Sequence, residues 1–230
     1  MSDPSLAERL EAIDQRIADA ARANRRDPGE ITRIVVTKFH PASLVRELWA
    51  LGVRDVGENR QQELHAKRAD LADLADLRWH FVGQAQTNKA RAIRHDAAAV
   101  HSVDRARLAD ALDRAAEPGE GALDVLLQVN LTSDPARGGA APSEAVPLAE
   151  HIAGCRGLRL RGVMAVAPLD EAPASAFARL AGVADAVRGV QPNARWISAG
   201  MTADFAEAIA AGATHLRIGS AITGNRPPRA

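Results

Sequence analysis

Short runs of apolar, often β-branched residues alternate along the chain with longer segments in which apolar residues recur every three or four positions. The short runs are typical of buried strands, and the longer spacing predicts amphipathic helices. The runs predict strands over residues 34–38, 53–57, 78–82, 98–103, 123–131, 158–166, 195–198 and 215–219. The longer segments predict helices over residues 5–26, 43–51, 59–74, 87–94, 104–116, 143–155, 173–190 and 202–211.

Strands that alternate with helices indicate right-handed β–α–β units and a parallel sheet. Eight strands, the first seven each followed by a helix, predict an α/β fold with a single (β/α)8 TIM-type barrel. An open doubly wound sheet is the alternative. The sequence after the last strand is too short for a full eighth helix. We therefore expect the additional N-terminal helix to cover that gap in the outer layer.

The predicted organisation is one domain over residues 1–230, with the N-terminal helix in 1–30, the barrel in 31–224 and a tail in 225–230. One stretch between predicted elements, residues 132–142, is rich in Gly, Pro and Ala. That composition predicts a mobile loop or lid rather than a linker between domains.

The charge balance and the cysteine count indicate which partners and which cell compartment to expect. The 29 basic and 29 acidic residues give a formal net charge of zero, and no basic stripe stands out, which argues against nucleic acid as a partner. The single cysteine, Cys155, cannot form an internal disulfide and favours a reducing compartment. Because the start lacks an apolar signal core and no apolar run reaches membrane length, we expect a cytoplasmic protein without a membrane partner.

The first predicted strand ends in a lysine, Lys38, and a lysine in a buried strand is costly unless it has a function or a partner. Only three of the 29 basic residues are lysines: Lys38, Lys67 and Lys89. Arginine supplies charge equally well, but Schiff-base chemistry needs a primary amine. Lys38 is therefore the candidate reactive group, and the alternative is a side chain that reaches out of the strand into solvent.

The loops after the last two predicted strands carry groups that suit a phosphate dianion. They offer the backbone N–H groups of Gly200 and Gly219, the hydroxyls of Ser198 and Ser220, and the N-terminus of the helix predicted from Thr202. In a parallel barrel all these strand ends meet at one opening. A lysine across that opening from a phosphate site fits a phosphorylated aldehyde held as an imine.

Six blocks, in order, carry a resemblance to a known family. They read VTK at 36–38, VGENRQQE at 56–63, WHFVGQ at 79–84, RGVMA at 161–165, SAGMT at 198–202 and RIGSAI at 217–222. Together they resemble the YggS/PROSC family, the pyridoxal 5′-phosphate (PLP) homeostasis proteins, from about residue 31 to 224. The resemblance implies a fold-type III PLP barrel like the N-terminal domain of alanine racemase. It also implies a role in keeping PLP available, without established catalytic turnover.

The same resemblance implies roles for single residues. Lys38 matches the Schiff-base lysine, Asn59 the asparagine near the cofactor ring, and Arg217 the arginine that faces the pyridine nitrogen. An arginine there leaves that nitrogen unprotonated and weakens PLP as an electron sink. The phosphate-binding positions match Ser198, Gly219 and Ser220. Helix capping by Asn59 and the serines, and an internal ion pair of Arg217, are the alternatives.

Two departures concern the shape of the barrel opening. Ala199 stands where the family frequently has methionine, and the loop over residues 133–139 lacks the lysine that relatives often carry. Elsewhere, His80 is expected to be a hydrogen-bonded core histidine, and Cys155 to be inert packing. No catalytic residue is assigned, and no cluster has the spacing of metal ligands.

The sequence leaves three functions open. The first is a PLP-binding protein of PLP (vitamin B6) homeostasis, a monomer with PLP-dependent apo-enzymes as candidate partners. The second is a PLP-dependent amino-acid racemase, which in alanine racemase uses a lysine and a tyrosine on opposite faces of the substrate. The chain contains no tyrosine, which argues against this reaction. The third is a phosphosugar enzyme that uses Lys38 as an aldolase-type amine.

Overall fold

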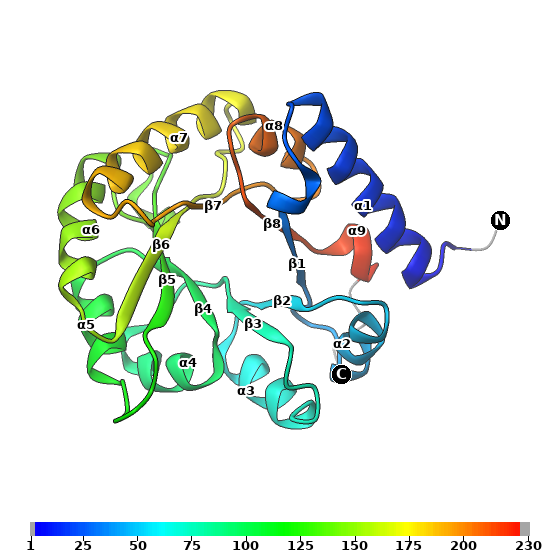
Figure 1. The fold of residues 1–230 in the computed structure, drawn as a ribbon, viewed down its shortest axis with the longest axis horizontal. Helices are drawn as coiled ribbons and strands as arrows, with labels where there is room; N and C mark the ends of the chain where they lie inside the picture. The colour runs from blue at the N-terminus through cyan, green and yellow to red at the C-terminus, as the bar shows by residue number, and fades with distance from the viewer. Residues whose placement is uncertain (1–2, 226–230) are drawn as a thin grey trace.

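Eight parallel strands close into a barrel in the order of the sequence, β1 to β8, with β8 paired to β1. The computed structural model describes residues 3–225, so most of the predicted tail lies outside the described residues. Figure 1 looks into the ring of strands, with the helices outside it. The predicted (β/α)8 barrel is confirmed, and the open sheet is excluded by the pairing of β8 with β1.

The elements keep the predicted order. The strands are β1 (Thr32–Val36), β2 (Asp55–Glu58), β3 (Arg78–Phe81), β4 (Ala99–Val103), β5 (Leu123–Gln128), β6 (Leu158–Met164), β7 (Trp196–Ser198) and β8 (His215–Ile218). The α-helices are α1 (Leu6–Ala23), α2 (Ala42–Ala50), α3 (Gln61–Asp70), α4 (Ala90–Asp96), α5 (Ala106–Arg114), α6 (Ala145–Gly154), α7 (Pro173–Val190), α8 (Phe205–Ala210) and α9 (Ser220–Thr223). Single 3-10 turns are η1 (Pro28–Glu30), η2 (Thr87–Lys89), η3 (Pro135–Arg137) and η4 (Pro142–Glu144).

Helix α1 fills the place of a full eighth helix, as expected. Its stripe of Leu10, Ile13 and Ile17 is buried, and its first turn is closed by reciprocal hydrogen bonds between Ser5 and Glu8. The helix lies against α8 and against the single turn of α9 (Figure 1). The Arg9 guanidinium donates to the carbonyl of Ile222 in α9 at 2.7 Å.

Two predicted boundaries at the barrel opening are wrong. The first strand ends at Val36 and not at Lys38, because a turn closed by the His40 N–H and the Thr37 carbonyl takes Lys38 out of the strand. The helix predicted from Thr202 begins at Phe205. Its start is delayed by a turn in which the Met201 N–H donates to the Asp204 carboxylate at 2.6 Å.

The loop over residues 132–142 is hydrogen-bonded near its end, through Ala140, to the last residue of β5 and to the segment that follows it. The Ala140 N–H donates to the Gln128 carbonyl, and Ala140 in turn accepts from the Asn130 N–H, each at 2.8 Å. Its mobility stays a prediction.

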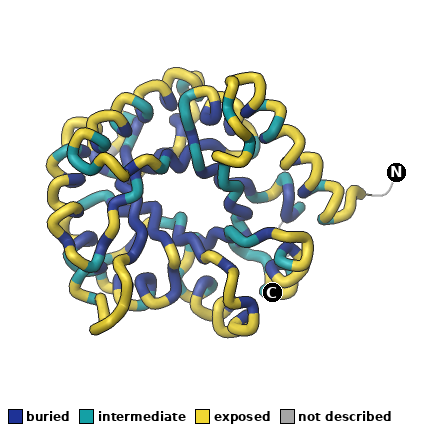
Figure 2. The backbone as a smooth tube through the Cα atoms, viewed as in Figure 1, coloured by how far each residue is buried: buried dark blue, intermediate teal, exposed yellow. Residues whose placement is uncertain are grey.

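Buried residues follow the strands and the inward faces of the helices, and exposed residues lie on the outer surface (Figure 2). The barrel interior is unusual because it holds polar groups: His80, His101, Ser198, His215 and Arg217 are all buried there. Among residues 3–225, no helix has the length and apolar character needed to cross a membrane.

Candidate functional site

Lys38 lies in the turn that follows β1, and the glycine–serine turn after β8 lies beside the end of that strand. β1 and β8 are neighbouring strands with Val35 opposite Ile218, and a Cβ added at Gly219 would lie 3.8 Å from the Cβ of Val36. The prediction that the lysine lies across the opening from this turn is therefore wrong. The two groups stand side by side on adjacent strands, which shortens the span a ligand must cover.

Hydrogen bonds from α3 and β2 hold the turn that carries Lys38. The Lys67 ammonium donates to the Thr37 carbonyl at 2.8 Å, and the Glu63 carboxylate accepts from the Phe39 N–H at 3.0 Å. Phe39 adopts a φ of 69°, a conformation uncommon outside glycine. Lys38 is partly buried, with Nζ 6.0 Å from the centre of the Phe39 ring.

A buried ion pair lies directly behind this turn. Glu58 Oε1 accepts from the Lys67 ammonium at 2.6 Å and from the Thr37 hydroxyl at 2.6 Å. Burial raises the pKa of Glu58, and the charge of Lys67 partly offsets that rise. The partner of Glu58 is thus one of the three lysines. Sequence reasoning counted Lys67 among the three lysines but gave it no role.

Asn59 comes next along the chain and offers an unpaired polar atom. Its Oδ1 position is buried without a hydrogen-bond partner among the described residues. As the amide is placed, this buried oxygen is left for a ligand to satisfy. The backbone is fixed by close packing, because a Cβ at Gly83 would lie 2.1 Å from the Asn59 carbonyl oxygen.

Arg217 points from β8 into the barrel, where it contacts neutral acceptors. Its Nη1 donates to Ser198 Oγ at 2.6 Å and its Nη2 to the Ala165 carbonyl at 2.8 Å. Within the described chain no carboxylate forms an ion pair with it, so the predicted alternative of an internal pair is not seen. Burial lowers the pKa of Arg217 to about 10, and the charge of Asp204 opposes that shift. The guanidinium therefore remains a cation at neutral pH.

Ser198 is fully buried at the end of β7, with its hydroxyl engaged on both sides. It accepts from Arg217 and pairs with His101 Nδ1 at 2.9 Å. His101 pairs through Nε2 with His80, and His80 with Asp55, at 2.9 and 2.8 Å. His80 is thus the hydrogen-bonded core histidine that was expected. A phosphate can receive the Ser198 proton only if the hydroxyl leaves His101.

The remaining phosphate candidates occupy different surroundings. Gly200 has a φ of 90° and packs on α8, since a Cβ there would lie 2.7 Å from the Cβ of Ala208. Its lack of a side chain is explained by this packing. Gly219 and Ser220 form the turn into α9, and Ser220 is exposed. Of the predicted set, the structure thus brings Lys38, Gly219 and Ser220 to one side of the opening.

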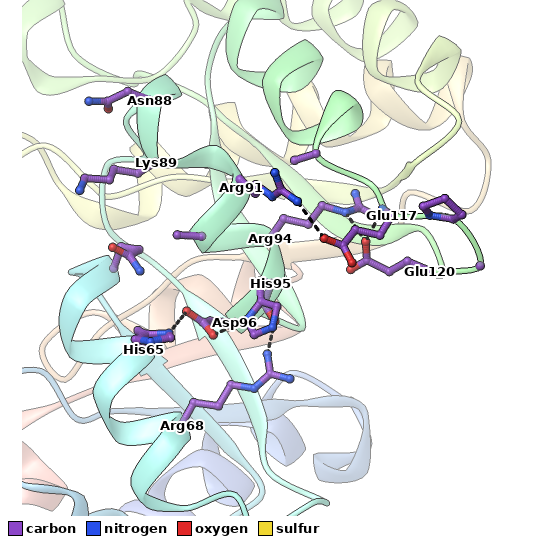
Figure 3. Close-up of a pocket in the computed structure, with 15 residues that line it drawn as sticks. His65, Arg68, Asn88, Lys89, Arg91, Arg94, His95, Asp96, Glu117 and Glu120 are labelled. Atoms are coloured by element: carbon purple, nitrogen blue, oxygen red, sulfur yellow. Dashed lines mark hydrogen bonds and ion pairs between the residues drawn. The ribbon is translucent and has the colours of Figure 1, made fainter.

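A separate charged pocket of about 940 Å³ lies outside the barrel, between α3, α4 and the loop after α5 (Figure 3). Asp96 sits between His65 and His95, at 3.0 and 2.9 Å. Arg91 pairs with Glu117, and the Arg94 guanidinium pairs with a second carboxylate of the same loop. None of the predicted site residues lines this pocket, and most of its charges pair with each other.

One set of metal-ligand types also comes together among the described residues. Ligand atoms of Asp110, His151 and Cys155 lie within 4.8 Å of one another. His151 Nε2 pairs with the Asp110 carboxylate at 2.7 Å, and the thiol donates to the His151 carbonyl. Burial and the charges of Asp113 and Asp110 raise the pKa of Cys155. The group is accounted for as a hydrogen bond between α5 and α6 with a packed, protonated thiol.

The family model "Alanine racemase, N-terminal domain" matches residues 9–227. The chain belongs to this family. The YggS/PROSC resemblance is confirmed by curated relatives named "Pyridoxal phosphate homeostasis protein". The relative from Pseudomonas aeruginosa is 40% identical over 222 residues, covering 96% of each chain. The relative from Mycobacterium tuberculosis is 40% identical over 242 residues, covering 97% of this chain and 94% of its own.

Solved structures agree with this assignment to the alanine racemase N-terminal domain family. PipY of Synechococcus elongatus PCC7942 with PLP bound is 35% identical, with a TM-score of 0.84 over 96% of this chain and 100% of PipY. Alanine racemase of Corynebacterium glutamicum is 15% identical, with a TM-score of 0.68 over 95% of this chain and 62% of the racemase. At that identity the racemase supports the shared barrel alone.

Proposed function

We propose that this chain binds PLP with Lys38 as the Schiff-base lysine and serves PLP homeostasis without strong catalytic turnover. The observation that carries the proposal is a lysine held on a braced turn beside Gly219 and Ser220, in a chain 35% identical to PipY, whose structure contains PLP. The names of the curated relatives support the same role.

The residues at the opening fit PLP in their chemistry. When bound, PLP supplies an aldehyde that reacts with a primary amine. Lys38 provides that amine, and the unpaired polar atom of Asn59 provides an orienting contact to the ring. Arg217 presents a cation that keeps a facing ring nitrogen unprotonated. Gly219 and Ser220 form the turn that would receive the phosphate, with Ser198 and Gly200 packed behind the opening.

Absorbance spectra with and without added PLP test the role of Lys38. We expect the protein to develop an imine band that borohydride reduction makes permanent, and Lys38→Ala to abolish it. Lys38→Arg retains the charge without a primary amine and should also lose the band. Lys89→Ala is the matched control, because Lys89 lines the separate charged pocket, and it should keep the band. A reducible adduct that survives in Lys38→Ala would refute the assignment.

The proposed absence of strong turnover has its own test. Racemisation of an amino acid needs a base on each face of Cα, and the sequence contains no tyrosine to act as the second base. We expect a chiral assay of the PLP-loaded protein with L-alanine to show no appreciable D-alanine. Appreciable turnover would favour the racemase instead.

We further propose a cytoplasmic monomer that exchanges PLP with PLP-dependent apo-enzymes. The partly exposed Lys38 side chain supports an attachment site that an incoming amine can reach. Size-exclusion chromatography with light scattering tests the monomer, with a mass near twice 24.4 kDa as the contradicting result.

A further inference from the structure

One side chain from each of five strands joins a hydrogen-bonded chain that crosses the barrel interior. Arg217 Nη1 lies 2.6 Å from Ser198 Oγ, which lies 2.9 Å from His101 Nδ1. His101 Nε2 lies 2.9 Å from His80 Nδ1, and His80 Nε2 lies 2.8 Å from Asp55 Oδ1. Asp55 begins β2, so the chain connects the amino end of the barrel to the residues at its opening.

The two ends of this chain have fixed hydrogen-bonding roles. A guanidinium only donates, and an ionised carboxylate only accepts. Burial tends to raise the pKa of Asp55, but the hydrogen bond from His80 and the charge of Arg78 oppose burial, and the pKa lies below its usual value. Asp55 is therefore an acceptor at neutral pH, and Arg217 is a donor.

The two histidines between these ends are neutral. Burial lowers the pKa of His80 and lowers that of His101 well below its usual value. A neutral imidazole donates from one ring nitrogen and accepts at the other. His80 must therefore donate from Nε2 to Asp55, because a lone pair there would face the carboxylate at 2.8 Å.

The proton on His80 Nε2 determines the donor and the acceptor of every other hydrogen bond in this chain. With its proton on Nε2, His80 accepts at Nδ1 from the Nε2–H of His101. His101 then accepts at Nδ1 from the Ser198 hydroxyl, which leaves a Ser198 lone pair for Arg217. All four donors point from Arg217 toward Asp55, so the bond dipoles align and strengthen one another.

We propose that this one-directional chain positions the Arg217 guanidinium, with His101 as its central positioning residue. The side chain of Arg217 has neutral partners in Ser198 and Ala165, so its orientation depends on a Ser198 hydroxyl that points away from it. His101 is the group that draws the hydroxyl proton away. The inference rests on the proposed function in one respect, because PLP is the ligand that Arg217 would face.

Nitrogen NMR of the PLP-free protein, labelled with 15N-histidine, tests the direction of the chain at neutral pH. We expect His80 and His101 both to be neutral with the proton on Nε2, their signals assigned by loss in His80→Gln and His101→Gln. A proton on Nδ1 of either ring, or a charged ring, would overturn the proposal.

Exchange of the Arg217 guanidinium protons with solvent tests the positioning itself. His101→Phe keeps an aromatic ring but removes both ring nitrogens. We expect the Arg217 guanidinium protons to exchange about tenfold faster, because the loss of one hydrogen bond predicts a change of that size. His101→Asn retains an acceptor at the place of Nδ1 and should restore most of the protection. His215→Phe is the matched control, because His215 is a buried barrel histidine outside the chain, and it should leave the exchange unchanged.

Equal exchange in the parent protein, His101→Phe and His215→Phe would overturn the positioning role. If His101→Phe fails to fold, His101→Asn and the ring-nitrogen spectra of the parent protein still decide the question. Both measurements use protein without PLP, so they remain readable even if Lys38 proves not to bind the cofactor.

Discussion

The residues on either side of Lys38 fix the point from which its side chain extends. Thr37 and Phe39 are each held by a side chain from α3, Lys67 on one side and Glu63 on the other. With both neighbours fixed, the side chain of Lys38 starts from one defined point at the barrel opening. Lys67 is thus a structural requirement of the turn, although no sequence motif singles it out.

Lys67→Met tests this requirement. The substitution leaves Glu58 as a buried carboxylate without its cation, and we expect a loss of about 3–5 kcal/mol in the free energy of unfolding. Arg46→Met is the control, because its pair with Asp73 is about half exposed and should cost about 1 kcal/mol or less. Urea unfolding measures both.

The double variant Glu58→Gln with Lys67→Met separates the buried charge from simple loss of packing. It removes both charges, so it should regain much of the stability lost in Lys67→Met. A Lys67→Met protein as stable as Arg46→Met would show that the pair does not brace the turn.

The residue types at the opening could be predicted from the sequence, but their partners could not. Lys38 and Asn59 follow strands and Arg217 lies one residue before the end of β8, and the order of strands is visible in the hydrophobic pattern. Lys67 and His101 reach their partners only through the register and closure of the barrel. His80 was expected to be hydrogen-bonded. The alternation of residues within one strand does not show, however, that its partners lie on the neighbouring strands.

At the scale of elements, α1 supports the turn that would receive the phosphate. It lies against α9, the single helical turn that follows Gly219. Arg9 makes the link through the carbonyl of Ile222. Four residues of isolated helix are unstable in water, so α9 depends on such packing.

Arg9→Met removes this link while keeping an apolar side chain. We expect faster hydrogen exchange in α9, most clearly at the Thr223 amide, which donates to the Gly219 carbonyl. Arg22→Met is the matched control on the same helix, since Arg22 is largely exposed and its side chain pairs with the equally exposed Asp19. Unchanged exchange over α9 in Arg9→Met would show that α1 covers the barrel without supporting this turn.

The order of elements was predictable, but many of their ends were not. Helix α7 has the bounds expected from its apolar spacing, because Pro173 starts it. The predicted strand over 123–131 ends earlier, at Gln128, because the chain beyond it bonds to the returning loop at Ala140. A long-range contact of this kind leaves no trace in local periodicity. The late start of α8 has a local cause instead, the turn closed by the Met201 N–H and the Asp204 carboxylate.

At the scale of the whole molecule, the barrel has a polar centre whose three histidines must stay neutral. His80, His101 and His215 are buried inside it, and their rings lie 5.1–6.5 Å apart between centres. Three protonated imidazoles cannot share this space without strong repulsion. We therefore expect the folded barrel to be stable at neutral pH and to lose stability in acid.

Burial lowers the pKa of His215 to about 3, and it also lowers the pKa values of His80 and His101. In the unfolded chain the pKa of each of these histidines is about 6.5. Below that pH these histidines bind protons in the unfolded state but not in the folded state. The free energy of unfolding therefore falls as the pH falls. Three such protons give at most about 4 kcal/mol per pH unit. The raised pKa of Glu58 acts in the opposite direction and reduces that slope.

Urea unfolding between about pH 6.5 and pH 5 should reveal this slope, in a range above the titration of Asp55, whose lowered pKa matters only in stronger acid. His215→Phe removes one of the three protons, so the free energy of unfolding should fall less steeply, by about 1.4 kcal/mol per pH unit. The comparison uses slopes, so any change in packing that shifts stability equally at each pH cancels. Equal slopes in the parent protein and in His215→Phe would show that His215 is protonated inside the folded barrel.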